Sequence, residues 1–137
     1  MNAARPVNPL KAASVVLCGC DGEELRPVSG LLNEAGCQVY HAETIEQLDQ
    51  LAAKENLDAI IIHVCPSRQQ FLPILGRPDL PPVIPLLGHT DRHLYLELLR
   101  RGAFDCVPLP VQRDELRRVL SLAIEDKRSQ LTASHAA

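Results

Sequence analysis

Thiols and imidazoles are the side chains of this sequence with the clearest capacity for chemistry. The five cysteines stand at positions 18, 20, 37, 65 and 106, and no pair has CxxC spacing. Cys20, Cys65 and Cys106, together with His63 and His89, could bind zinc or sense redox state if the fold brought them to one edge. Cysteine is equally a small apolar residue that suits a core. Because ligand spacing is missing, we expect no resident metal or cofactor, and the sensor remains an alternative.

Few other residues near these positions in the sequence could act as metal ligands or nucleophiles. Asp21 could be a metal ligand, but it also stands where a side chain would cap the helix that follows a strand. His63 could accept a phosphoryl group or bind a metal, or it could bond to backbone at a strand end. The sequence shows no nucleophile–base pair and no phosphate-binding glycine loop. We therefore expect a protein that is not an enzyme.

The overall composition narrows the classes of partner. The 137 residues suit one domain, and 46% of them are hydrophobic. A net charge of −3, with two Phe, two Tyr and no Trp, provides neither the basic surface nor the stacking platforms that nucleic acid needs. No apolar run reaches the about 18 residues that would span a membrane. The odd cysteine count and the absence of a visible export signal predict a cytoplasmic location.

A strand buried on both faces is the predicted centre of the fold. Residues 57–66 contain the β-branched run Ile60-Ile61-Ile62 without polar alternation, which is typical of such a strand. The other predicted strands are 14–19, 37–42, 82–87 and 104–107. Helices are predicted from Asp21 to Ala35, from Thr44 to about Ala52, over 69–75, from Thr90 to Gly102, and from Val111 or Gln112 to Lys127. Residues 1–13 are predicted to be a disordered arm and 129–137 a flexible tail, which leaves 14–128 as the domain.

The alternation of strands and helices predicts the architecture. Short strands separated by helical segments form βαβ units, whose crossovers are right-handed and whose sheets are parallel. We therefore predict an α/β fold of the flavodoxin-like type, a doubly wound five-stranded parallel sheet of order 2-1-3-4-5 with helices on both faces. In such a sheet the carboxyl ends of the strands share one edge, where ligands gather.

The chain resembles the receiver domain of bacterial two-component response regulators over about residues 14–127. The clearest signature is Arg101-Gly102-Ala103-Phe104-Asp105-Cys106-Val107-Pro108-Leu109-Pro110, which is similar to the family's Gly-Ala-x-Asp-Tyr-Leu-x-Lys-Pro. Pro82-Val83-Ile84, Leu57-Asp58 and the stretch from Gln112 to Leu116 support it. The resemblance implies a signalling function.

Most of the family's phosphorylation groups are missing from the matching positions, and at most one acid of the acidic pair remains. Receivers use an acceptor aspartate, an acidic pair that binds Mg²⁺, a Ser or Thr, and a Lys before a cis-proline. Those positions fall here on Ile62 or His63 for the acceptor, on Cys20 and Asp21 (or Gly19 and Cys20) for the acidic pair, and on Leu87 and Leu109 for the last two. Cys106 replaces the switch aromatic. The resemblance implies a cis Leu109–Pro110 bond, although X-Pro bonds are trans by default.

We therefore expect a receiver-like module that acts through protein–protein contact without aspartyl phosphorylation. The resemblance implies a contact surface on the fourth helix, fifth strand and fifth helix, with Arg92, His93, Tyr95, Leu96, Arg100 and Arg117. Its partners would be a kinase, a regulator or an output protein, or a second copy of this chain. A solvated helix face would have the same composition. Two functional alternatives remain, a receiver phosphorylated at His63 and a thiol or imidazole sensor.

Overall fold

The sheet has the predicted topology. The computed structural model describes residues 10–19, 26–64, 69–88 and 92–136, with side chains up to residue 129. Within these ranges, five parallel strands form one sheet in the order β2-β1-β3-β4-β5. The prediction of a flavodoxin-like α/β fold is therefore confirmed.

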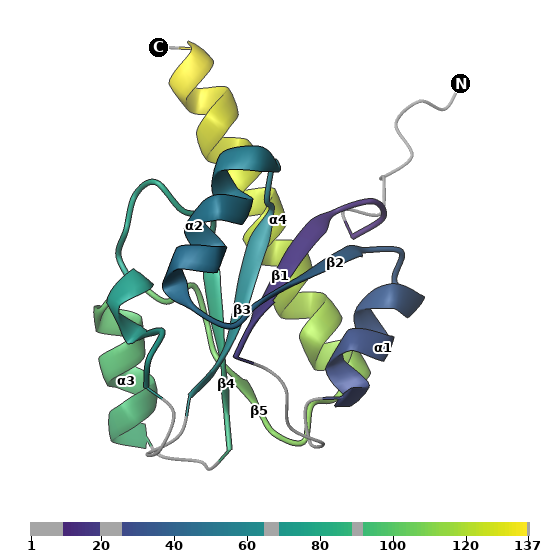
Figure 1. Cartoon of the computed structure of the whole chain (residues 1–137), viewed down its shortest axis with the longest axis vertical. Helices are drawn as coiled ribbons and strands as arrows, with labels where there is room; N and C mark the ends of the chain where they lie inside the picture. Colours follow the sequence, from purple (N-terminus) through teal and green to yellow (C-terminus); the bar gives the residue numbers. More distant parts are fainter. Residues whose placement is uncertain (1–9, 20–25, 65–68, 89–91, 137) are drawn as a thin grey trace.

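Helices cover both faces of this sheet (Figure 1). The strands are β1 (Ser14–Cys18), β2 (Gln38–Ala42), β3 (Ala59–Val64), β4 (Val83–Leu87) and β5 (Val107–Pro108). The helices are α1 (Arg26–Glu34), α2 (Ile45–Lys54), α3 (Arg92–Arg100) and α4 (Arg113–Ala136), with a short 3-10 helix η2 (Leu72–Ile74). Side chains of α1 and α4 belong to one hydrophobic cluster, and those of α2 and α3 belong to another. The sheet therefore separates two cores.

Strand β3 is the centre of the molecule, as predicted. All six of its residues are buried. Ile61 packs in the cluster that contains α1 and α4, whereas Ile60 and Ile62 pack in the cluster that contains α2 and α3. Because both faces are covered, both sets of side chains are apolar and the strand shows no polar alternation.

Pro85 accounts for a difference at one edge of the sheet. The sequence predicts a fifth strand over 104–107, but β5 contains only Val107 and Pro108. The Val83 carbonyl accepts a bond from the Phe104 N–H, so the backbone of Val83 faces β5, and that of Pro85, two residues later, does too. Pro85 has no N–H to donate to the residues before Val107, and the β4–β5 ladder begins only at Val107.

Two helices differ in extent from their predictions. The predicted helix 69–75 is reduced to η2, because Pro73 removes a backbone donor and Gly76 turns the chain with φ of +83°. The last helix, predicted to end near Lys127, continues to Ala136. Residues 128–136 contain neither glycine nor proline, so nothing in them stops a helix. The mobility of 129–137 in solution stays a prediction.

A capping box starts α2 at Thr44, where the helix was predicted to begin. The Thr44 hydroxyl accepts a bond from the Gln47 N–H at 3.1 Å. The Gln47 side chain accepts in return from the N–H of Glu43 at 2.7 Å, one residue before the expected partner. These two bonds fix the direction in which the chain leaves β2.

The predicted N-terminal arm is too long at its inner end. Leu10 and Ala13 are buried in the cluster of α1 and α4. The N–H of Ala12 donates to the Gly36 carbonyl at 2.8 Å. Residues 10–13 therefore belong to the domain, because their apolar side chains close the end of that core.

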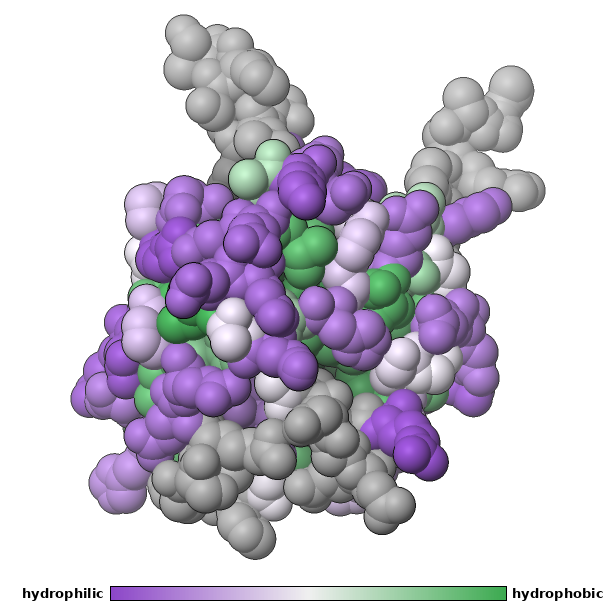
Figure 2. Space-filling model, in the orientation of Figure 1, coloured by the Kyte–Doolittle hydropathy of each residue, from purple (hydrophilic) through white to green (hydrophobic). Residues whose placement is uncertain are grey.

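Polar side chains dominate the outside of the domain. Figure 2 shows hydrophilic side chains over most of the visible face, with small hydrophobic areas between them. Within the described ranges, no helix combines the length and the apolar character needed to cross a membrane.

Candidate functional site

Aliphatic residues occupy the carboxyl edge of the sheet, at the bottom of Figure 1. Val64 ends β3 in register with Leu87 at the end of β4, and Leu87 in turn pairs with Pro108. The N–H of Leu109 donates to the Leu87 carbonyl at 2.8 Å. Strand β1 continues into Gly19 at this edge. None of these five residues carries a carboxylate, a hydroxyl or an amine.

The candidate acceptor positions are inside the sheet. Ile62 is fully buried. His63 follows it and is 8% exposed. Neither can bind a cation through a carboxylate oxygen. The acidic-pair candidates Cys20 and Asp21 lie outside the described residues.

Leu87 and Leu109 are brought together as the resemblance implies. Leu87 is buried and Leu109 is half-buried. The peptide bond between Leu109 and Pro110 is cis, so this expectation is confirmed. The structure therefore contains the expected cis peptide bond, and the side chains at positions 87 and 109 are isobutyl groups.

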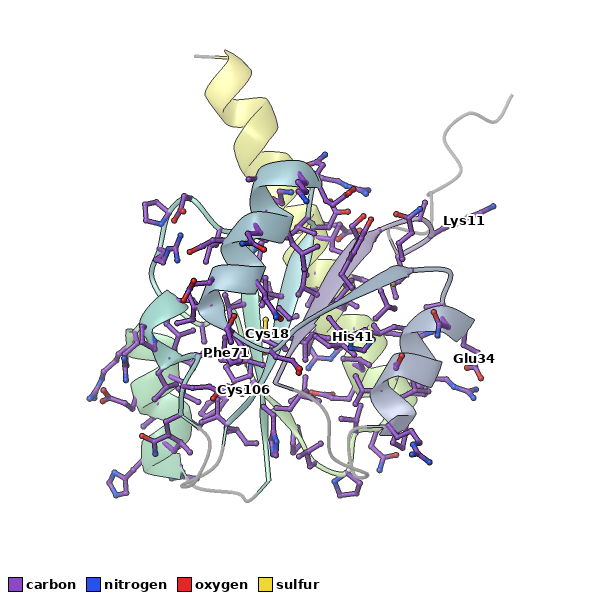
Figure 3. The ribbon with its side chains drawn as sticks, viewed as in Figure 1. Lys11, Cys18, Glu34, His41, Phe71 and Cys106 are labelled. Atoms are coloured by element: carbon purple, nitrogen blue, oxygen red, sulfur yellow. The ribbon has the colours of Figure 1, made fainter. Side chains whose placement is uncertain are left out.

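Phe71 is a residue of this edge that the sequence did not identify. A Cβ placed on Gly19 would lie 3.1 Å from Phe71 Cε2, so the ring lies against the backbone just after β1. Phe71 is buried in the same hydrophobic cluster as Cys18 and Cys106 (Figure 3). The ring therefore adds apolar surface to the five described edge residues, none of which is charged. The sequence feature that could have indicated a buried position for Phe71 is that it is a single aromatic residue in a segment containing prolines.

The proposed zinc or redox cluster does not form among the residues that can be placed. Cys20, Cys65 and His89 lie outside the described ranges. Cys106 packs in the cluster of α2 and α3, whereas His63 alternates with Ile62 and projects from the opposite face of β3. Among the described side chains, no group of three or more His, Cys, Asp or Glu could hold a metal ion.

The described cysteines are protected thiols. Cys18, Cys37 and Cys106 are buried and are not in disulfide bonds. Burial raises the pKa of Cys106 to about 12, with a smaller contribution from the charge of Asp105. Burial also raises the pKa of Cys37, whose thiol donates to the Leu10 carbonyl at 3.3 Å. Since the thiolate is the reactive form, these residues suit a core better than a sensor.

We expect Cys106 to react with iodoacetamide about 10³-fold more slowly than a free thiol at pH 8, because a raised pKa leaves little thiolate. Linkage gives a second readout. The folded pKa lies above the ordinary value of 9.0, so the contribution of this thiol to stability is constant below about pH 9 and falls as pH rises towards about 12. Peptide mapping of timed alkylation and urea unfolding at several pH values measure the two effects. Rapid labelling of Cys106 in the native protein would contradict the assignment.

Exposed apolar side chains lie on α3 and on α4, and we call the surface formed by α3, β5 and α4 the α3–β5–α4 face. Tyr95 is 36% exposed, Leu96 43% and Leu122 46%. The Tyr95 hydroxyl donates to Asp105 Oδ1 at 3.2 Å, which holds the ring beside the start of β5. The predicted interface residues Arg92, His93 and Arg100 are exposed on α3. Leu122 is an addition that the helical pattern had not marked.

Arg117 belongs to a different side of the molecule, which corrects its assignment to this face. Arg113, one turn earlier on α4, pairs with Glu34 of α1 at 3.1 Å. Arg117 itself lies close enough to Cys37 for its charge to lower the pKa of that thiol. Leu122 instead precedes Asp126 by one turn, and Asp126 lines a cavity with Phe104. The two flanks of α4 therefore face different neighbours.

Comparison with known proteins identifies the fold but no closer relationship. No family model and no curated protein matches the sequence. NtrX from Brucella abortus superimposes with a TM-score of 0.76 and 22% identity over 92% of this chain, which spans 30% of the NtrX chain. A response regulator receiver domain protein from Clostridium thermocellum matches with a TM-score of 0.72 and 22% identity, over 86% of this chain and 98% of its own. The receiver domain of Francisella response regulator 1452 matches with a TM-score of 0.68 and 22% identity, over 84% and 98%. The chain therefore has the fold found in response regulator receiver domains.

Proposed function

We propose that this chain is a receiver-like signalling module of a bacterial two-component or phosphorelay system that acts without aspartyl phosphorylation. It would be a cytoplasmic, non-catalytic protein that works by contact with other signalling proteins. The observation that supports this best is the carboxyl edge, where the cis Leu109–Pro110 frame is kept and the phosphoryl-binding side chains are not.

The chemistry of the edge supports the loss of phosphotransfer. Mg²⁺ needs several oxygen ligands in octahedral geometry, and the described residues at the ends of β3, β4 and β5 offer no carboxylate. Leu87 and Leu109 cannot pair with a phosphoryl dianion. An unpaired charge placed against buried aliphatic side chains costs several kcal/mol, so the modified state would be strongly disfavoured.

The first alternative function is that of a receiver that is phosphorylated at His63. His63 is 8% exposed, so a phosphoryl donor has little access to its ring. Its neighbours along β3, Ile62 and Val64, are buried and apolar. Phosphorylation of His63 is therefore disfavoured, and the experiment below would detect it.

We expect no mass increase and no spectral change when the protein is incubated with acetyl phosphate and Mg²⁺, or with beryllofluoride. Intact mass and ¹⁵N–¹H spectra would be recorded beside a receiver domain that keeps its acceptor aspartate, as the positive control. An acid-labile phosphoryl group lost in a His63→Ala variant would establish the histidine alternative. A modification insensitive to that variant would overturn the proposal as a whole.

The proposed contact surface is the α3–β5–α4 face. Aromatic and aliphatic side chains surrounded by arginines are typical of interface composition, since Tyr and Arg are enriched there. Tyr95 is already held by Asp105, so less side-chain entropy would be lost on binding. A second copy of this chain is the partner that can be tested without further components.

We expect Tyr95→Ala to raise the dissociation constant of a homodimer about five- to thirtyfold, by removing an aromatic anchor worth about 1–2 kcal/mol. Arg117→Ala is the matched control, because Arg117 lies on the other flank of α4 and should leave the dimer unchanged. Sedimentation velocity over a concentration series measures both. A wild-type protein that stays monomeric at about 100 μM would exclude the homodimer as the working state.

A further inference from the structure

A groove lies at the amino end of the sheet, away from the carboxyl edge. Its volume of about 650 Å³ falls within the range of ligand-binding pockets. The end of α2, residues 76–82, the connection from α3 to β5, and α4 line it. In Figure 1 the loop before β4 rises beside α2, and α4 passes behind α2.

The wall formed by residues 76–82 is held in place before any ligand binds. The Arg77 guanidinium binds Asp79 at 2.6 Å and Asp49 of α2 at 3.0 Å. Gly76 packs directly against Gly102, where an added Cβ would lie 2.6 Å from the Gly76 nitrogen. Three prolines in the same stretch restrict the backbone further. Such a preformed groove loses little entropy on binding.

The wall is poor in hydrogen-bond donors. The prolines at 78, 81 and 82 have no N–H group. Other N–H groups of the wall already donate to carbonyls of this chain, namely those of Arg77, Leu80, Gly102 and Phe104. An anionic ligand would therefore find few donors here, whereas a ligand that brings its own N–H groups would suit the wall.

The charges point to the same class of ligand. Both cations of the lining are directed inward, Arg77 to its two aspartates and Lys127 to the Leu57 carbonyl and Asp58. The carboxylates of Glu55 and Asp126 are exposed at the mouth. The lining therefore carries three carboxylates, those of Glu55, Asp79 and Asp126, against the two cations of Arg77 and Lys127. The Glu55 carboxylate also accepts a bond from the Tyr40 hydroxyl at 3.2 Å.

We propose that this groove binds an extended segment of a partner protein that carries an arginine or a lysine. The cationic group donates to the carboxylates at the mouth, while its methylene stem packs on the proline rings and on Phe104. This site is independent of the carboxyl edge, so it does not depend on whether the chain is phosphorylated. It would allow two different partners to be bound at once.

The test uses ¹⁵N-labelled full-length protein titrated with the peptide acetyl-Gly-Arg-Leu-Arg-Gly-amide. We expect saturable amide shifts confined to residues 52–57, 76–83, 102–104 and 126–127, and none with the peptide in which Glu replaces both Arg. The double variant Glu55→Lys with Asp126→Lys should weaken binding at least about fivefold.

Glu46→Lys with Glu43→Lys is the matched control, because it changes net charge equally on exposed positions outside the groove. Binding in this control should stay within about twofold of wild type. The proposal is overturned by equal weakening in both double variants, by shifts spread over all acidic surfaces, or by no saturable shift up to about 10 mM peptide.

Discussion

Replacing Gly102 by alanine is expected to lower the free energy of unfolding by about 3–5 kcal/mol. Gly102 has φ of +114°, which strains any residue with a Cβ. The new Cβ would also lie 2.6 Å from the nitrogen and 2.7 Å from the Cα of Gly76. Since these are backbone atoms, no side-chain rotation relieves the clash. Urea unfolding followed by far-UV circular dichroism measures the loss.

Gly30→Ala is the matched control for that substitution. Gly30 lies in α1, and a Cβ there would have no neighbour within 4 Å. Alanine at this position should stabilise the protein by about 0.5–1 kcal/mol, because it reduces the entropy of the unfolded chain. A loss below about 1 kcal/mol for Gly102→Ala would show that the packing of residues 76 and 102 is not tight. Failure of Gly102→Ala to fold, with Gly30→Ala folded, would agree with the expectation.

Local signals were sufficient to predict the fold. The isoleucine run of β3, the capping box at Thr44 and the glycine at 36 each act within a few residues of the chain. Gly36 indeed has φ of +91° just after α1. Features that depend on contacts between strands could not be predicted from the sequence. The position of β5 depends on which neighbour the backbone of Pro85 faces, and that is defined only once the strands are in register.

The candidate site was predictable where it follows strand ends. Leu87 and Leu109 are fixed by their strands, so their meeting follows from the topology. Arg117 and Leu122 could not be assigned to the correct flank of α4. Helical periodicity identifies the buried stripe, but packing against both neighbours decides which flank faces α1. Phe71 was missed because its position depends on a turn that no regular element determines.

Phe71→Ala is expected to cost about 3–5 kcal/mol of unfolding free energy, because it removes a buried ring and leaves a cavity. The ring lies against Gly19 and shares a cluster with Cys18 and Cys106. Its loss would therefore leave a cavity beside these residues at the carboxyl edge. Urea unfolding measures the cost. Alkylation of Cys18 and Cys106 should also become faster in the variant, because water then reaches the cluster.

Two controls separate the ring's packing from its mere hydrophobicity. Phe71→Leu keeps most of the apolar volume and should cost only about 1–1.5 kcal/mol, with both thiols still protected. Leu96→Ala removes an exposed side chain and should change stability by no more than about 0.5 kcal/mol. If Phe71→Ala were as mild as Leu96→Ala, the ring would not be part of the core, and the apolar closure of the carboxyl edge would have to be assigned to Leu87 and Leu109 alone. A large cost confined to Phe71→Ala would instead show that the ring is part of the core beside Gly19.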